Sequence, residues 1–85
     1  MKLTAHTTVA ELRGMDRIGR AEALEDALPG QLRTLREPVG RLLDIGGRHF
    51  VVAGTYCCVG GQYSGDAWEV GTPLDGELHT VSFWD

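Results

Sequence analysis

The chain has 85 residues, of which 42% are hydrophobic and 24% are charged, and its formal net charge is −4. This size allows one domain, with a core close to the lower limit for independent stability. The composition is too apolar for a disordered chain, and no apolar run reaches the roughly 20 residues of a membrane span. No signal-peptide pattern is present, and the adjacent cysteines Cys57 and Cys58 cannot form a disulfide framework, so we expect a cytoplasmic protein without a membrane partner.

The acidic residues are unevenly distributed. Acidic and basic side chains cancel up to residue 38, so the whole net charge of −4 lies in residues 39–85. A domain that binds duplex nucleic acid normally carries a basic stripe. We therefore expect no direct binding of nucleic acid.

The first residues predict a short strand followed by a short helix. Residues 2–5 alternate between polar and apolar side chains, which favours an edge strand. Thr8 and Glu11 have the spacing of a capping box, which predicts a helix from Val9 to Arg13. Gly14 is suited to end that helix.

A second, longer helix is expected between Asp16, which can cap it, and the breaking pair Pro29–Gly30. Asp16 and Arg20 are spaced for an i,i+4 ion pair on its surface. One stripe is expected to face the core, and it consists of Ile18, Ala21, Leu24 and Leu28. Leu32 and Leu35 are expected to pack against the core from one further turn.

From Val39 onward the apolar period changes to two, as in strands. Residues 42–45 and 48–52 predict a hairpin around the two-residue turn Gly46–Gly47. We expect this strand pair to be central in a sheet and to be covered by a helix on one side. The turn fixes the cross-strand partners as Leu42 with Val51, Leu43 with Phe50, and Asp44 with His49.

The rest of the chain predicts a middle strand at Thr55 to Val59, a glycine-rich loop at Gly60–Asp66 and a final hairpin. Asp75–Gly76 is a strong signal for the two-residue turn of that hairpin. The resulting register pairs Val70 with Val81 and Trp68 with Phe83. One face then carries Trp68, Val70, Val81 and Phe83, and the other carries Glu69 and Trp84.

These elements predict an α+β fold in a single domain, 1–85. Its N-terminal part, 1–38, is mainly helical and packs on a four-stranded antiparallel β-meander formed by 39–85. A small SH3-like barrel with N-terminal helices is the alternative closure of the same strands.

Catalytic and metal-binding patterns are weak. Adjacent strand residues point to opposite faces, so Cys57 and Cys58 do not have zinc-ligand spacing, and one of them is expected in the core. Asp44 opposite His49 resembles an orienting pair, with Ser64 or a cysteine as the nucleophile, yet no pattern brings these groups together. We expect no catalytic residue, no metal and no cofactor.

The features that indicate recognition lie in the acidic half of the chain. Tyr63 on a loop of small residues is a rigid aromatic anchor of the kind found at interfaces. Trp84, placed on the face of Glu69, would be an aromatic ringed by carboxylates, which suits docking onto a basic protein surface. The candidate partner-binding residues are Tyr63, Asp66, Glu69, Asp75, Glu77 and Trp84.

We therefore predict a small non-enzymatic inhibitor that binds a protein partner with a basic surface and sterically blocks a nucleic-acid-binding host complex. Inhibitors encoded by phages and mobile elements, including inhibitors of CRISPR effectors, often have this size and charge balance. One alternative is an antitoxin-like or assembly subunit whose core is completed by formation of a homodimer. Another is a minimal metal-dependent enzyme that uses His49, Asp44 and the cysteines.

Overall fold

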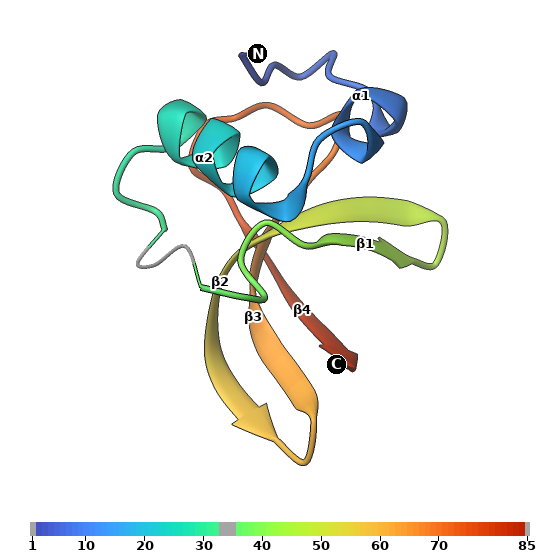
Figure 1. Cartoon of the computed structure of the whole chain (residues 1–85), viewed down its shortest axis with the longest axis vertical. Coiled ribbons are helices and arrows are strands. Elements are labelled where there is room, and N and C mark those ends of the chain that lie inside the picture. The colour runs from blue at the N-terminus through green and yellow to red at the C-terminus, as the bar shows by residue number, and fades with distance from the viewer. Residues whose placement is uncertain (1, 33–35, 85) are drawn as a thin grey trace.

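The computed structural model describes residues 2–32 and 36–84, and within them it contains two helices and four strands. The elements are α1 (Val9–Arg13), α2 (Arg17–Ala27), β1 (Leu42–Ile45), β2 (Arg48–Val59), β3 (Gln62–Glu69) and β4 (His79–Trp84). The strands form one antiparallel sheet in the order β1-β2-β3-β4, which curls into a half-barrel under the helices (Figure 1). The predicted α+β class and meander are confirmed. Within the described ranges, no helix is long and apolar enough to cross a membrane.

Both helices begin at the predicted capping residues. The Thr8 hydroxyl accepts a hydrogen bond from the N–H of Glu11 at 3.2 Å. The Asp16 carboxylate accepts one from the N–H of Gly19 at 2.6 Å. These side chains satisfy N–H groups that have no partner within the helix, so they fix where each helix begins.

The predicted edge strand at residues 2–5 is wrong, because this segment leads into a turn. The N–H of Thr4 donates to the Thr7 hydroxyl at 2.8 Å, and the N–H of Thr7 donates back to the Thr4 carbonyl at 3.1 Å. Thr7 is buried, and Leu3 is buried in the core. Local side-chain to backbone bonds of this kind compete with strand pairing.

The buried side of α2 differs from the predicted stripe. Ala21, Leu24 and Leu28 are buried as expected, but Ile18 is 40% exposed and Ala23 is buried in addition. The expected pairing of Arg20 with Asp16 is also replaced. The guanidinium of Arg20 donates to three backbone carbonyls, those of Leu12, Met15 and Gly40, at 2.5–3.0 Å.

This placement of Arg20 follows from the close approach of the chain at Gly40. Gly40 has a φ of +88° and lies so near α2 that a Cβ there would clash with the carbonyl oxygen of Arg17. The Gly40 carbonyl is thereby brought within reach of Arg20. Arg17 reaches the neighbouring Val39 carbonyl at 2.7 Å. Two helix arginines therefore attach the segment that leads into β1.

The β1–β2 hairpin has the predicted turn and the predicted register, with Leu43 opposite Phe50 and Asp44 opposite His49. Of these two strands, β2 lies inside the sheet as expected, whereas β1 lies at an edge, so the pair as a whole is not central. β2 runs without a break through Val59 and contains two irregularities, between Val52 and Gly54 and between Thr55 and Cys57.

The predicted register of the last two strands is wrong. Phe83 lies opposite Tyr63, and Val81 lies opposite Gly65. β3 ends at Glu69, and a long connection, 70–78, replaces the expected two-residue turn. Three side chains of this connection cause the change, because they pack against the helix-side core: Val70, Leu74 and Leu78.

The two faces of the sheet bury two separate cores. The helix-side core is formed by Leu3, Leu12, Ala23, Leu24, Leu28, Val51, Ala53 and Trp68. The inner core lies on the other face, inside the curl of the sheet, and is formed by Phe50, Val52, Ala67, Val81 and Phe83. The predicted common face of Trp68 and Phe83 is thus divided between the two cores.

Candidate protein-binding surface

The outer half of the β2–β3 hairpin projects away from the helices. Figure 1 shows both helices at one end of the molecule and the tip of this hairpin at the opposite end. The tip is a two-residue turn, Gly60–Gly61, with φ values of +60° and +85°. Such a turn requires positive φ at both positions and matches the twist of the flanking strands. The predicted loop at Gly60–Asp66 is therefore wrong beyond Gly61, since β3 begins at Gln62.

Large apolar side chains are exposed on this part of the sheet. Tyr56 is 64% exposed, Val59 is 71% exposed and Trp84 is 69% exposed. Val59 lies opposite Gln62, and Gln62 lies opposite Trp84, so these three residues form one cross-strand row on one face. We call Val59, Gln62 and Trp84 the apolar row after its two outer members; the middle residue, Gln62, is polar. Exposed apolar groups that gather in this way mark interaction surfaces.

The apolar row lies on the sheet face that the helices cover elsewhere. Side chains alternate along β3, so Gln62, Asp66 and Trp68 share a face. Trp68 is fully buried under the helices, whereas Gln62 is exposed beyond them. The same face thus changes from a packed core at Trp68 to an open surface at Gln62, six residues away along β3.

Two of the predicted partner-binding residues lie away from the apolar row. Tyr63 is on the opposite face, half-buried, and its ring stacks on Phe83 with a centroid distance of 5.4 Å. Glu69 is also on the opposite face, because it shares the alternation of Tyr63 along β3. The expected ring of carboxylates around Trp84 depended on the predicted register and does not form with Glu69.

The other acidic candidates are spread along the molecule. Asp66 is on the face of the apolar row, four residues along β3 from Gln62. Asp75 and Glu77 are exposed in the connection before β4, and the Asp75 carboxylate accepts a hydrogen bond from the N–H of Glu77 at 3.1 Å. They adjoin the start of β4, whereas Trp84 is at its end.

Glu69 is held by interactions within the molecule. Its two carboxylate oxygens accept hydrogen bonds from the guanidinium of Arg48 at 2.7 and 2.8 Å, and His79 lies 3.6 Å from one of them. The hydrogen bond from Arg48 is the main cause that lowers the pKa of Glu69, and the same pair raises the pKa of Arg48. Both oxygens of the Glu69 carboxylate are therefore already engaged within the molecule.

Cys57 and Cys58 are both free and both exposed, so the prediction that one of them lies in the core is wrong. They belong to the part of β2 that projects beyond the helices, where neither face of the sheet is covered. Cys57 lies opposite Ser64, and Cys58 lies opposite Tyr63.

The structure separates the residues considered for catalysis. His49 is 3.6 Å from Asp44 at the β1–β2 hairpin. Ser64 lies opposite Cys57, eight residues further along β2 from His49, which at about 3.3 Å per residue is roughly 25 Å away. Among residues 2–32 and 36–84, no three side chains of His, Cys, Asp or Glu come together as a metal site.

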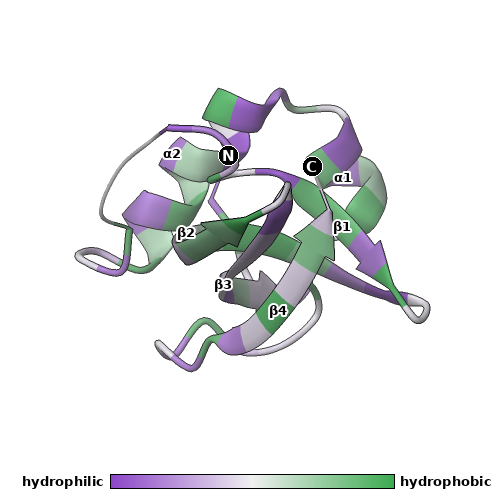
Figure 2. Cartoon of the chain, turned by 90° about the horizontal axis from the view of Figure 1, so that it is seen from below, coloured by the Kyte–Doolittle hydropathy of each residue, from purple (hydrophilic) through white to green (hydrophobic). Residues whose placement is uncertain are grey.

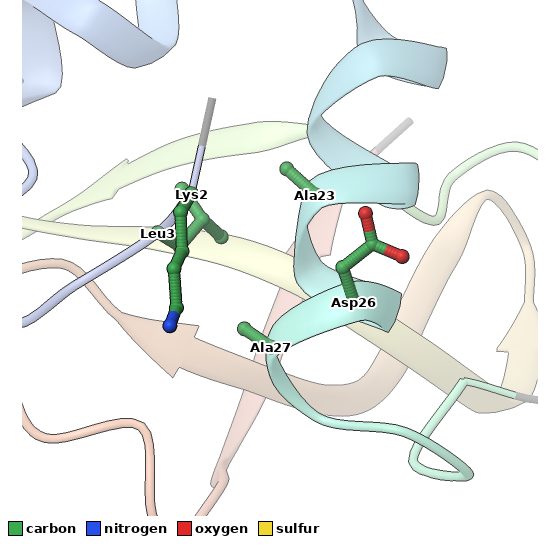
Figure 3. A pocket seen from close by; sticks show the side chains of 5 residues that line it. All are labelled: Lys2, Leu3, Ala23, Asp26 and Ala27. Atoms are coloured by element: carbon green, nitrogen blue, oxygen red, sulfur yellow. The ribbon is translucent and has the colours of Figure 1, made fainter.

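A shallow pocket of about 300 Å³ lies between the N-terminal segment and α2. Figure 3 shows Lys2 and Leu3 on one side of it and Ala23, Asp26 and Ala27 on the other. This volume is at the lower limit for ligand pockets. Its two charged residues, Lys2 and Asp26, do not form a catalytic set.

Tyr56 and Val59 were not expected from the sequence to be part of a binding surface. The available signal was the absence of Asp, Glu, Lys and Arg between Arg48 and Asp66 in a chain that is 24% charged.

The comparisons add no assignment, because the chain matches no protein-family model and no curated protein or solved structure shows significant similarity to it.

Proposed function

We propose that this protein is a non-enzymatic, cytoplasmic protein-binding inhibitor that acts by covering a surface of its partner. The exposed apolar row on the projecting end of the sheet is the observation that carries this proposal. Trp is among the residues that contribute most to binding when they become buried in an interface. The apolar row is presented on paired strands, so little ordering is needed on binding.

A partner with a basic surface fits the charge of the molecule. The net charge of −4 lies after residue 38, in the half that forms the sheet, and Asp66 shares the face of the apolar row. Carboxylates at the rim of an interface speed association with a cationic surface and make it sensitive to salt. A nucleic-acid-binding host complex has such a surface, and CRISPR effectors blocked by phage-encoded inhibitors are one class of it.

Affinity capture with matched variants tests this proposal. The tagged protein is used to retain partners from a host-cell lysate at low and high salt, and a purified partner is then tested for nucleic-acid binding in its presence. Trp84→Ser and Val59→Ser should each reduce capture at least tenfold. Ile45→Ser removes an apolar side chain that is 39% exposed on the β1–β2 hairpin, and it should leave capture unchanged.

The outcomes are distinct. Inhibition through the apolar row is supported if the wild-type protein abolishes nucleic-acid binding by a basic partner and the Trp84→Ser protein does not. Equal capture by wild type, Trp84→Ser and Val59→Ser would exclude this surface. A partner that binds the protein and nucleic acid at the same time would exclude steric inhibition.

A further inference from the structure

The outer edge of β4 is open. β4 is the last strand in the sheet order, and its six residues pair on one side with β3. In an antiparallel sheet, half of the backbone N–H and C=O groups of an edge strand point outward. Within the described part of the chain, no other strand pairs with that outer side.

β4 also lacks the features that normally keep an edge strand from pairing. Natural edges are protected by charged residues, proline, bulges or short length. From His79 to Trp84 there is no Lys, Arg, Asp, Glu, Pro or Gly, and the six pairs with β3 show no register shift. Figure 2 shows β4 as alternating green and pale residues after a purple first residue. By contrast, the part of β2 that extends beyond its pairing with β1 contains a register irregularity, between Thr55 and Cys57.

We propose that the edge of β4 pairs with the same edge of a second copy of this chain, antiparallel, about a two-fold axis at Ser82. The absence of charged side chains on β4 suits a contact between two copies. Each chain carries a net charge of −4, which opposes association in general, and β4 is a surface where two copies meet without placing carboxylates against each other. A two-fold contact brings the same strand from both copies together, so no carboxylate faces another in the pairing.

The alternation of β4 restricts the register to two-fold axes that pass through a residue, and of these the axis at Ser82 pairs the two buried residues with each other. Val81 and Phe83 are buried on the inner face, whereas Thr80, Ser82 and Trp84 are exposed on the other. An axis at Ser82 places Val81 opposite Phe83 of the second copy and Thr80 opposite Trp84 of the second copy. A slip by one residue would pair the buried face of one copy with the exposed face of the other.

This pairing produces a continuous sheet with eight strands, four from each copy. The two-fold axis is then perpendicular to the sheet, so both apolar rows lie on the same side. The inner cores of the two copies adjoin through Val81 and Phe83. The inference requires no partner other than the chain itself, so it stands independently of the proposed function.

Disulfide trapping at Ser82 tests the register. In a Cys57→Ser, Cys58→Ser background, Ser82→Cys places the two introduced thiols directly opposite each other, with Cα atoms about 4.5–5.5 Å apart, within disulfide range. Ser64→Cys is the matched control, because Ser64 and Ser82 are neighbours on the same face, with their hydroxyls 3.3 Å apart. The two Ser64 positions would be separated by three strand spacings, about 14 Å, which is too far for a disulfide.

Mild oxidation should convert most of the Ser82→Cys protein into a covalent dimer and leave the Ser64→Cys protein monomeric. Sedimentation over a concentration series gives a second readout. Ser82→Lys places two like charges at the axis and should weaken dimer formation at least tenfold, whereas Gln62→Lys, on the same face of β3, should not. A wild-type protein that is monomeric at all concentrations, equal trapping of both cysteine variants, or a dimer that tolerates Ser82→Lys would each overturn the proposal.

Discussion

The ring of Tyr63 stacks on the ring of Phe83, with the two planes inclined by 19°. The two residues are direct cross-strand partners, and Phe83 belongs to the inner core. The guanidinium of Arg41 lies over the ring of Phe83, 5.8 Å from its centroid. Tyr63 is therefore part of the packing that holds β4 to β3 and closes the curl of the sheet.

Tyr63→Ala should destabilise the protein by about 2 kcal/mol, because it removes a stacked, half-buried ring from the inner core. The free energy of unfolding in urea measures this loss. Tyr56→Ala is the control, since Tyr56 is 64% exposed and its removal should change stability by less than about 0.5 kcal/mol. Equal effects of the two variants would contradict the structural role of Tyr63.

Gly65 and Gly54 should respond very differently to alanine. A Cβ at Gly65 would meet the Gly54 carbonyl oxygen and the Thr55 Cα, the latter at 2.9 Å, whereas a Cβ at Gly54 would meet nothing within 4 Å. Gly65→Ala should therefore destabilise the protein by about 3 kcal/mol, because the backbone of the paired strands must move. Thermal denaturation of the two variants makes the comparison, and a stable Gly65→Ala protein would show that the strands are further apart.

Arg20→Met should destabilise the protein by roughly 2–4 kcal/mol. The substitution keeps an apolar stem but removes the donors that satisfy the carbonyls of Leu12, Met15 and Gly40, and hydrogen bonds from charged groups contribute more than neutral ones. Arg13→Met is the matched control on the exposed surface of α1 and should change the free energy of unfolding by less than about 0.5 kcal/mol.

The pair between Arg48 and Glu69 predicts a specific loss of stability in acid. Because the folded state lowers the pKa of Glu69, the pair contributes stability above the ordinary carboxyl range, about pH 4, and that contribution is lost as the pH falls through the lowered pKa. Glu69→Gln should therefore be less stable than wild type at pH 7, and the difference should decrease toward pH 2. Denaturation at both pH values tests this, and a constant difference would contradict the linkage.

Features set by neighbouring residues could be predicted from the sequence. The caps at Thr8 and Asp16 and the turn at Gly46–Gly47 depend on residues within a few positions, and they determine the helix starts and the first hairpin register. The register of β3 with β4 could not be predicted in this way. The Asp75–Gly76 turn signal is local, but it lies within a longer connection whose Leu74 and Leu78 contact the distant helix-side core.

The candidate surface was predictable only in part. The alternation of β4 places Trp84 on the face opposite Phe83 whatever the register, and Trp84 is exposed because it lies beyond the part of that face that the helices cover. Its neighbours do depend on register, so Glu69 was placed beside it in error, while Val59 was overlooked. The hydrogen bonds between Arg48 and Glu69 join residues 21 positions apart, so no local sequence pattern predicts them.

The division of the helix-side core between the two halves of the sequence has a consequence for folding during synthesis. Leu12 and Leu24 emerge from the ribosome before Val51 and Trp68, the residues against which they become buried. Helices of this length are unstable in water without such a surface. The helical half is therefore expected to remain largely unstructured until β2 and β3 have been translated, and the inner core can form only after β4, with Val81 and Phe83, has followed.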